Sequence, residues 1–444
     1  MQYLKYIILC LGFATTVNAQ QEIGLYSLND LWQSNQLNPA FMPDSKLIIS
    51  LPGLRNNLFL TGATLGDFLV ESDTATFIDF NQAIAAMDDE NILRNELQVE
   101  TLSFMFRPGQ GNFMISLGHK ARVSAYALYP KALAQIAYQG NTQFIGQTID
   151  VGTDFVFSSF NEFSLGLGYK TGKFTFGGKI KYLTGIENAQ SDPNKNQATI
   201  TTSDDVYQVT LNSNYQLNTA GAITYNGFDE IDVNFDPSSI DGALFSANNG
   251  FAFDIGVTYA ASDKLTLSAS ILDIGSIEWS DGVTNYLSEG TFTYDGLDIS
   301  DAISDGDDID GFSGVLDTLQ AIFMTRESNE SYTMDLPRKI YLGAAYDVTD
   351  KMTVGGTYFT ESFRGQTFQA IGASATFDAT NFLTVGASYS TLLESEKHFN
   401  LGLNAVINLG PVQLFGVTDN IISLFQVDDA QVVNARFGVN VVFR

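Results

Sequence analysis

An acidic stretch near the middle of the chain carries the residue types best suited to hold a metal ion. It reads DGLDISDAISDGDDIDGFSGVLD, from Asp295 to Asp317. Loops rich in carboxylates bind hard cations, and the twelve-residue calcium loop has a glycine at its sixth position. With Gly311 there, Asp308 and Asp310 occupy the third and fifth positions, and Asp317 replaces the usual glutamate at the twelfth. The first position is a glycine, so the match is partial. These three aspartates are a candidate Ca²⁺ site, and a charged surface loop without metal is the alternative.

Catalytic chemistry is poorly represented elsewhere. The two histidines, His119 and His398, lie in or beside alternating strand-like stretches. A hydrolase would need a serine, a histidine and an acid in register on one face, and the alternation assembles no such set around either histidine. The sequence also has no phosphate loop, dinucleotide fingerprint or metal-ligand spacing. It therefore predicts a protein without enzymatic activity and, apart from the calcium candidate, without a cofactor.

The first residues have the pattern of a secretory signal peptide. MQYLKYIILCLGFATTVNAQ has Lys5, then an apolar run, then Val17-Asn18-Ala19 as a small-residue cleavage box. We expect cleavage after Ala19. Cys10, the single cysteine, lies within this segment, so the mature chain would have no thiol.

Composition narrows the class of protein. The net charge of −28 excludes nucleic-acid binding, because phosphates need basic partners. Charged residues make up 16% of the chain, against about 25% in typical soluble domains, while 45% is apolar. The sequence shows no apolar run of the roughly 18 residues that a membrane-spanning helix needs. Few charges and many aromatic residues favour a wall of strands that faces lipid.

Five strand-turn-strand units repeat along the chain. They begin at Phe163, Phe253, Ile340, Ile371 and Asn400. In the second unit, Phe253, Ile255 and Val257 share one face, opposite Asp254 and Gly256, which is the alternation of a strand with unlike faces. Turns inside the units are short and connections between them are long, as in transmembrane barrels with short periplasmic turns and long extracellular loops.

Parity suggests a strand count. The five hairpins supply ten strands, and the terminal ARFGVNVVFR supplies an eleventh. Three alternating stretches upstream, Thr101 to Arg107, Phe113 to Tyr129 and Thr148 to Phe157, bring the total to fourteen, with twelve or sixteen as alternatives. Because lipid offers no partner to an open sheet edge, the last strand should pair with the first and close the wall.

The predicted fold is therefore an all-β, transmembrane antiparallel β-barrel with an N-terminal plug. We assign residues 1–19 to the signal peptide, 20–96 to the plug and 97–444 to the barrel, with extracellular loops at about 185–250 and 281–335. One short helix is expected within IDFNQAIAAMDDENILRNEL. LIISLPGL, Leu47 to Leu54, is an alternative wall strand inside the plug region. Asp254, Thr258, Lys179 and Lys181 are expected to face a partly polar lumen.

Several motifs resemble known families. LNPAFMP (Leu37 to Pro43) is similar to an Asn-Pro-Ala element near the start of long-chain fatty-acid transporter-like (FadL-like) barrels and of barrels associated with type IX secretion and gliding. SASILDIGSIEW, GPVQLFGVTDNIISLF and NARFGVNVVF resemble an uncharacterised Bacteroidota outer-membrane family over nearly the whole mature chain. The first resemblance implies fourteen strands and a plug.

Two functions in the Gram-negative outer membrane are expected on these grounds. One is passive transport or binding of a small apolar solute. The other is an accessory or scaffold barrel for secretion or gliding machinery, with a lipoprotein or secretion partner. Outer-membrane lipid and the barrel assembly machinery are partners expected in either case.

Overall fold

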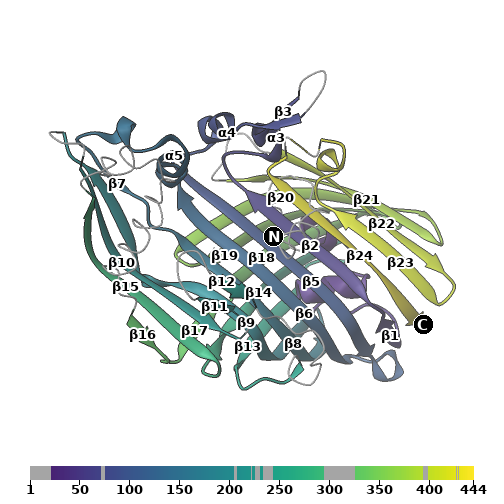
Figure 1. Cartoon of the computed structure of the whole chain (residues 1–444). Helices are drawn as coiled ribbons and strands as arrows, with labels where there is room; N and C mark the ends of the chain where they lie inside the picture. The colour runs from purple at the N-terminus through teal and green to yellow at the C-terminus, as the bar shows by residue number, and fades with distance from the viewer. Residues whose placement is uncertain are drawn as a thin grey trace.

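The computed structural model describes residues 22–71, 76–204, 208–221, 223–225, 231–233, 244–294, 326–393, 399–426, 428 and 430–444. Within these ranges the chain is almost entirely antiparallel strand (Figure 1). No helix among them is long and apolar enough to cross a membrane.

The wall is a closed antiparallel barrel of fourteen strands. The first strand consists of two pieces, β1 (Leu47–Ser50) and β2 (Gly53–Leu60), separated by Leu51 and Pro52. The others, in order around the wall, are β5 (Glu90–Phe106), β6 (Phe113–Pro130), β8 (Asp154–Thr171), β9 (Phe174–Thr202), β13 (Asn249–Ala260), β14 (Leu265–Trp279), β18 (Arg338–Thr349), β19 (Met352–Phe363), β20 (Gln366–Thr380), β21 (Leu383–Leu392), β22 (Phe399–Leu409), β23 (Val412–Thr418) and β24 (Val432–Phe443). The predicted fold class is confirmed.

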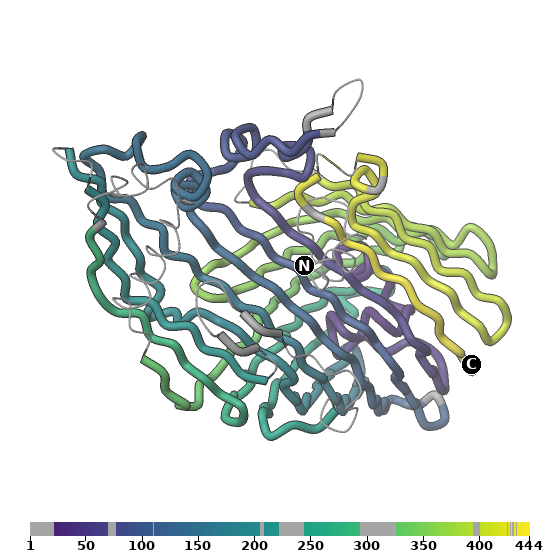
Figure 2. Tube along the Cα trace, viewed as in Figure 1, coloured from purple at the N-terminus to yellow at the C-terminus, as the bar shows by residue number. Residues whose placement is uncertain are grey.

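The seam between the two chain ends closes the wall. β24 pairs with β1, with Leu47 opposite Phe443, and with β2, with Leu54 opposite Phe437. Both pieces also pair with β5 on their other side. In Figure 2 the yellow last strand runs beside the purple first strand. This pairing leaves neither end strand with an open edge, as closure required.

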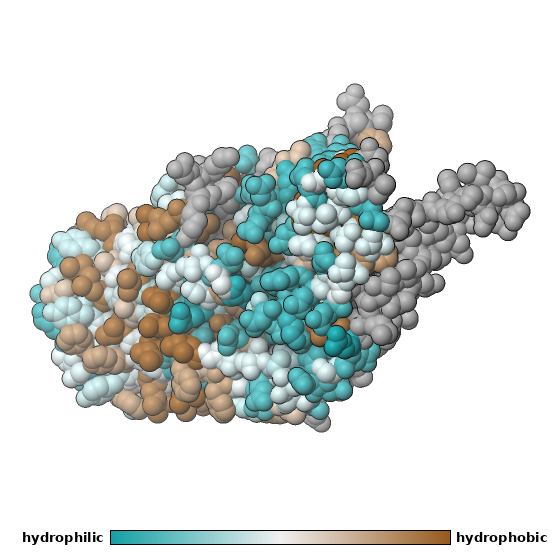
Figure 3. Space-filling model, turned by 90° about the vertical axis from the view of Figure 1, so that its left-hand side faces the viewer, coloured by the Kyte–Doolittle hydropathy of each residue, from teal (hydrophilic) through white to brown (hydrophobic). Residues whose placement is uncertain are grey.

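Side chains alternate between the two faces of the wall. On β8, for example, Leu165, Leu167 and Tyr169 are about half exposed, while the intervening Gly166 and Gly168 are buried. On β24, exposed Phe437 and Phe443 alternate with buried Arg436 and Asn440. Hydrophobic residues gather over one part of the face seen in Figure 3, and hydrophilic residues over another. The wall is therefore apolar outside, and its inner face carries both polar side chains and buried apolar clusters.

Short turns join the strands at one end of the barrel, and the connections at the other end are longer, except for the two-residue turn Arg364–Gly365 between β19 and β20. At the long-connection end, β9 extends to pair with β10 (Val209–Ala220), which pairs with β15 (Val283–Tyr294). Smaller elements at that end are β3 (Leu69–Glu71), β4 (Thr76–Ile78), β7 (Thr148–Asp150), β11 (Ile223–Tyr225), β12 (Ile231–Val233), β16 (Arg326–Ser328), β17 (Tyr332–Asp335), α3 (Leu65–Phe68), α4 (Phe80–Ala86), α5 (Lys131–Gln139), η3 (Thr142–Phe144) and η4 (Ile422–Leu424), whereas η2 (Pro108–Gln110) is a tight turn between β5 and β6. The connection predicted around 185–250 thus carries strands of its own.

The N-terminal segment from Glu22 to Lys46, which we call the plug, lies inside the barrel (Figure 1). It contains α2 (Ile23–Tyr26) and η1 (Trp32–Gln36). Ile23, Leu25 and Tyr26 are almost fully buried in a cluster with inward residues of several wall strands. Trp32 Nε1 donates a 2.8 Å hydrogen bond to Ser103 Oγ on β5.

Three boundary predictions need correction. The wall begins at Leu47, so the predicted plug boundary at residue 96 is wrong, and the alternative strand Leu47 to Leu54 is right. Thr148 to Phe157 is no separate wall strand, because it comprises β7 and the start of β8. The count of fourteen holds since these two errors cancel. The expected helix is α4 alone, and the residues after it enter β5.

Candidate functional site

A group of buried ionic side chains, which we call the charged centre, fills the middle of the lumen. It comprises Arg55, Arg94, Glu96, Arg122, Glu162, Lys181, Asp254, Asp273, Lys339 and Glu361. Alternation turns nine of these side chains inward, and the bulge in β14 turns the tenth, Asp273, inward as well; five of the ten are basic and five are acidic. A buried charge is tolerated only when it is paired, so the balance is a requirement of burial.

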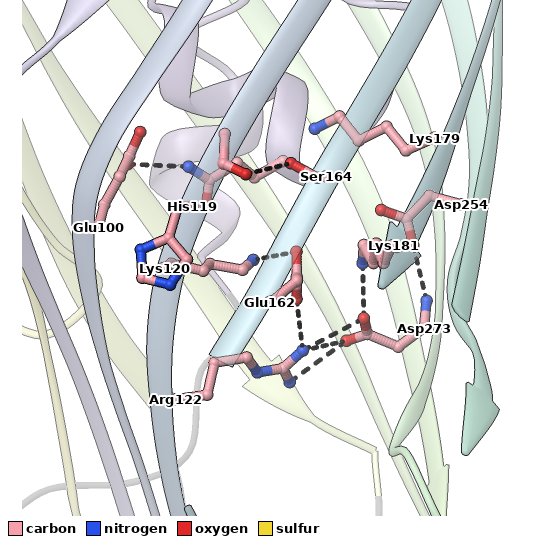
Figure 4. Close-up of polar contacts among 12 residues, drawn as sticks. Glu100, His119, Lys120, Arg122, Glu162, Ser164, Lys179, Lys181, Asp254 and Asp273 are labelled. Carbon is pink, nitrogen blue, oxygen red and sulfur yellow. Dashed lines mark hydrogen bonds and ion pairs between the residues drawn. The ribbon is translucent and has the colours of Figure 1, made fainter. Parts of the chain in front are cut away.

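One half of the charged centre is organised by Asp273 (Figure 4). Arg122 Nη1 lies 3.3 Å from Asp273 Oδ1 and 3.1 Å from Glu162 Oε2. Lys181 Nζ lies 2.6 Å from Asp273 Oδ1 and 2.7 Å from Asp254 Oδ1. The backbone N–H of Asp273 donates to Asp254 Oδ1 at 2.8 Å. Two carboxylates are thus bridged by one ammonium group.

The other half connects opposite sides of the wall. Glu96 on β5 accepts from Arg55 Nη1 at 2.8 Å and from Lys339 Nζ on β18 at 3.1 Å. Arg94 on β5 pairs with Glu361 on β19. Removing one member of such a buried pair typically costs about 3–5 kcal/mol. The charged centre therefore acts as a cross-brace between opposite sides of the wall.

The plug is anchored to the wall by charge as well as by packing. Glu22 pairs with Arg55 at 2.9 Å and with Arg436 on β24 at 2.8 Å. Burial raises the pKa of Glu22, but the two guanidinium groups outweigh burial and hold that pKa below its ordinary value. The Gly24 N–H donates to Asp419 Oδ1 at 2.7 Å. Burial raises the pKa of Asp419 to about 7, although this hydrogen bond acts in the opposite direction.

Next to the plug, Lys179 on β9 has an unusual setting. Its Nζ donates to the Asn35 carbonyl at 2.8 Å and lies 5.9 Å from the centre of the Trp32 ring. A cavity of about 30 Å³, enough for a water molecule, lies beside it. This contact ties the plug to the strand that carries Lys181.

The ladder between β14 and its neighbours is interrupted at Asp273. Residues up to Leu272 pair with β18, and those from Ser276 onward pair with β17. Asp273 has a φ of +58°, which is uncommon for a residue other than glycine. A bulge against β13 falls at the same place. Bulges and unusual backbone angles concentrate near functional sites, which makes this break a candidate site.

A cavity of about 450 Å³, which we call the wall cavity, occupies this break. Its lining includes buried Asp273 and the exposed Asp335 and Arg338. The wall cavity therefore reaches from the lumen to the outer surface of the wall. Ile274, Met334, Leu336 and Phe363 give it apolar walls, and Gln190, Thr333 and Arg364 contribute polar groups.

The turn between β19 and β20 covers the wall cavity. Arg364 Nε donates to Asp154 Oδ2 at 3.0 Å, and its Nη2 donates to the Ser191 carbonyl at 2.6 Å. Asp154 and Ser191 belong to β8 and β9, while β13, β14 and β18 lie between them and β19 in the wall. The Phe363 ring meets Tyr126 on β6 edge-on, with 5.4 Å between centroids. The turn thus reaches across the lumen.

A second cavity of about 710 Å³ lies at the short-turn end. Its lining includes the plug residues Asp30 and Asp44, the turn residue Asp350, and Asp347 and Asp378 near the ends of β18 and β20. Asp30 is exposed within this cavity, and desolvation by the surrounding protein, together with the nearby carboxylates of Asp378 and Asp44, raises its pKa. The plug and the charged centre separate this acidic vestibule from the wall cavity.

The sequence-predicted residues have different outcomes. Lys179, Lys181 and Asp254 face the lumen as predicted. The calcium candidates Asp308, Asp310 and Asp317, and also His398, lie outside the described residues. The Nδ1 atom of His119 lies 2.7 Å from Thr101 Oγ1, and its ring lies 4.5 Å from that of Phe163.

Several members of the charged centre were not predicted. Glu96, Arg122 and Glu162 stand at inward positions of alternating strands, whereas alternation would place Asp273 outward and only the bulge turns it inward. For Glu96, Arg122 and Glu162, a charge on the inner face of an alternating strand was the signal that could have predicted them. Which charges meet across the lumen depends on strand stagger, which no single strand encodes.

Three solved structures illustrate what the chain is similar to. The toluene transporter TbuX of Ralstonia pickettii has a TM-score of 0.44 and 11% identity, with 94% of this chain and 95% of that chain covered. A FadL homologue of Pseudomonas aeruginosa has a TM-score of 0.41 and 10% identity, covering 97% and 99%. The CymD monoaromatic hydrocarbon channel has a TM-score of 0.34 and 9% identity, covering 97% and 98%. The fold itself rests on the strand pairing described above.

Sequence comparison gives one match. A family model described as "Family of unknown function (DUF5723)" matches residues 39–419. No curated protein matches the chain.

Proposed function

The chain belongs to the family of unknown function DUF5723, and we propose from its geometry that it lies in the outer membrane and passes a small, mainly apolar solute passively. The proposal includes insertion of the barrel by the assembly machinery and contact of its outer face with lipid. A band of exposed apolar side chains around a closed wall is the arrangement that hydrocarbon requires.

The wall cavity is the observation that carries this proposal. Its volume of about 450 Å³ lies within the range of about 300–1,000 Å³ typical of small-molecule sites. Met334 and Leu336 are each 4% exposed and present apolar surface to it. An apolar solute gains free energy by leaving water for such a surface.

The charged centre inside the lumen supports a sideways route for the solute, through the wall of the barrel. A solute moving straight through would have to cross the charged centre, where displacing paired ions is costly. The wall cavity instead reaches the outer surface of the wall at the break beside Asp273. In the proposed mechanism, the solute enters from the long-connection end, occupies the wall cavity and leaves through the break into the membrane. No energy source is needed, since partitioning drives the movement.

Filling the wall cavity tests the proposal. Ser362 lines the cavity, whereas Ser262 lies in an exposed short turn at the opposite end. The uptake rate of an apolar fluorescent probe would be measured in a Gram-negative host with an intact outer membrane. We expect the wild-type protein to raise uptake above the empty-vector rate, Ser362→Phe to abolish the increase and Ser262→Phe to retain it. Uptake by the wild type at the vector rate would exclude transport.

The accessory role in secretion or gliding requires a different readout. It calls for a large partner, such as a lipoprotein, that co-purifies with the barrel from native membranes. The described residues contain no feature that favours this role over the wall cavity's, so transport is the function we propose.

A further inference from the structure

We propose that the wall cavity binds a neutral, mainly apolar molecule with one hydrogen-bond donor, such as a phenol or an alcohol, and that the Gln190 side chain accepts that hydrogen bond. The inference rests on the proposed function and adds the chemical class of the solute. Gln190 belongs to the part of β9 that extends beyond its pairing with β13.

The orientation of the Gln190 amide is fixed by its neighbour. Gln190 Nε2 donates to the Thr333 carbonyl of β17 at 3.4 Å. A carbonyl oxygen can only accept, so the amide nitrogen must face Thr333 and the amide oxygen must face elsewhere. The hydrogen bond therefore removes the ambiguity between the two ends of the amide.

The amide oxygen that results is buried and unpaired. Gln190 is 3% exposed, and its Oε1 has no hydrogen-bond partner among the residues that the structure describes. Buried acceptors in native proteins are almost always satisfied, so an exception calls for an explanation. Because Gln190 lines the wall cavity, a small rotation of its side chain would present this oxygen, which is covered in the structure, to a donor on a bound molecule.

The buried charged groups around the wall cavity are already occupied, whereas Asp335 and Arg338, which also line it, are exposed at its outer rim. Asp273 is held by Arg122 and Lys181. Arg364 is held by Asp154 and Ser191. In the buried part of the cavity, beside Gln190, an anionic ligand would have to displace Asp154 from Arg364, and a cationic ligand would have to displace Arg122 or Lys181 from Asp273, which favours a neutral ligand there. A hydroxyl group needs neither exchange.

The rest of the cavity lining determines that the ligand is apolar apart from its hydrogen-bond donor. Met334, Leu336 and Phe363 surround the space beside Gln190 with apolar surface. A molecule that is apolar except for one hydroxyl matches this combination. A pure hydrocarbon would fill the space but would leave the Gln190 oxygen unpaired, and it should therefore bind more weakly.

Naphthol and naphthalene form a matched pair of probes, since they differ by one hydroxyl. Their binding would be measured by equilibrium dialysis of the full chain in lipid nanodiscs, with empty nanodiscs as the partitioning reference. We expect the wild type to bind naphthol about fivefold to tenfold more tightly than naphthalene, as one hydrogen bond allows. Gln190→Leu should lose this preference and still bind naphthalene. Gln413→Leu, at the short-turn end of the lumen, should keep it.

The outcomes separate this inference from the function on which it rests. Equal binding of the two probes by the wild type would overturn the hydrogen-bond assignment and leave the apolar site intact. A preference that survives in Gln190→Leu would place the acceptor elsewhere. Binding of neither probe above the empty nanodiscs would overturn the proposed function itself. The comparison of the two probes on the wild type stays decisive even when Gln190→Leu fails to fold.

Discussion

Asp419 joins the end of β23 to the plug, and its chemistry makes this contact sensitive to pH. The side chain is fully buried, its Oδ1 accepts from the Gly24 N–H, and its Oδ2 has no partner among the described residues. Burial raises the pKa of Asp419 from 3.8 to about 7. Near neutral pH, a proton on this carboxyl therefore relieves the cost of a buried charge.

The first prediction follows from the sign of this shift. A carboxyl with a raised folded-state pKa binds its proton more tightly in the folded chain than in the unfolded one. The free energy of unfolding should therefore fall as pH rises from about 4 to about 7, and then level off. Asp419→Asn removes the titration while its oxygen still accepts from Gly24. Thermal unfolding from about pH 5 to about pH 8 should show a larger loss of Tm in the wild type than in Asp419→Asn. Parallel curves would contradict the assignment.

At the residue scale, the sequence predicts which side chains face inward better than which of them meet. The alternation around Asp254 and Lys181 places both in the lumen, and their 2.7 Å ion pair joins neighbouring strands. The pairing of Lys339 with Glu96 joins distant strands and depends on how the barrel closes. The break at Asp273 has no signal in residue type, because aspartate is ordinary in a polar lumen.

Among the elements, the plug depends on glycine where it passes close to the wall. A Cβ atom on Gly177 of β9 would lie 2.1 Å from the backbone of Pro39, and one on Gly256 of β13 would lie 2.0 Å from Asn38 Oδ1. The Asn-Pro-Ala element noted in the sequence thus packs directly against these two glycines. Its own conformation is fixed by the Ala40 N–H, which donates to Asn38 Oδ1 at 3.0 Å.

The second prediction uses a pair of neighbouring glycines. A Cβ on Gly178 would meet nothing closer than 3.8 Å, because this residue faces the other side of the wall. Gly177→Ala should therefore push Pro39 away and loosen the plug, whereas Gly178→Ala should leave the plug in place. Limited proteolysis of the plug in detergent would reveal the difference. Equal protection in both variants would show that the plug does not depend on this contact.

The sequence predicts element boundaries well where the alternation is long, and its predictions are wrong where the alternation is short or interrupted. The five hairpins are found where the sequence places them, because each strand repeats its pattern over many residues. β1 and β2 are short and interrupted by Pro52, which lacks the N–H that a ladder needs. The stretch Thr148 to Phe157 alternates but is divided between β7 and β8, since sequence alone does not show where a strand leaves the wall.

For the whole molecule, closure decides whether the barrel exists at all. β24 supplies hydrogen bonds to β1, β2 and β23, so its loss would leave two open edges. Open edges cannot persist in hydrocarbon. The composition and the terminal alternation were enough to predict this closure, because the requirement applies to the wall as a whole.

The third prediction tests the closure directly. The intact protein should migrate faster in detergent gels before heating than after it, because the closed wall resists unfolding. Deleting Val432 to Arg444, which removes β24, should abolish the heat-dependent shift. Arg444→Ala, which changes only the residue after the strand, should preserve it. A deletion mutant that still shows the shift would argue against closure through β24.

The position of the plug at the start of the chain has a consequence for biogenesis. The plug is synthesised before the wall strands, and the last wall strands follow it by several hundred residues. Contacts such as Glu22 with Arg436 join the two extremes of the polypeptide, and contacts of such sequence separation form late and slowly. Until these contacts form, the plug lacks its partners on the last wall strands. We therefore expect the plug to gain its contacts with the wall only when the last strands pair.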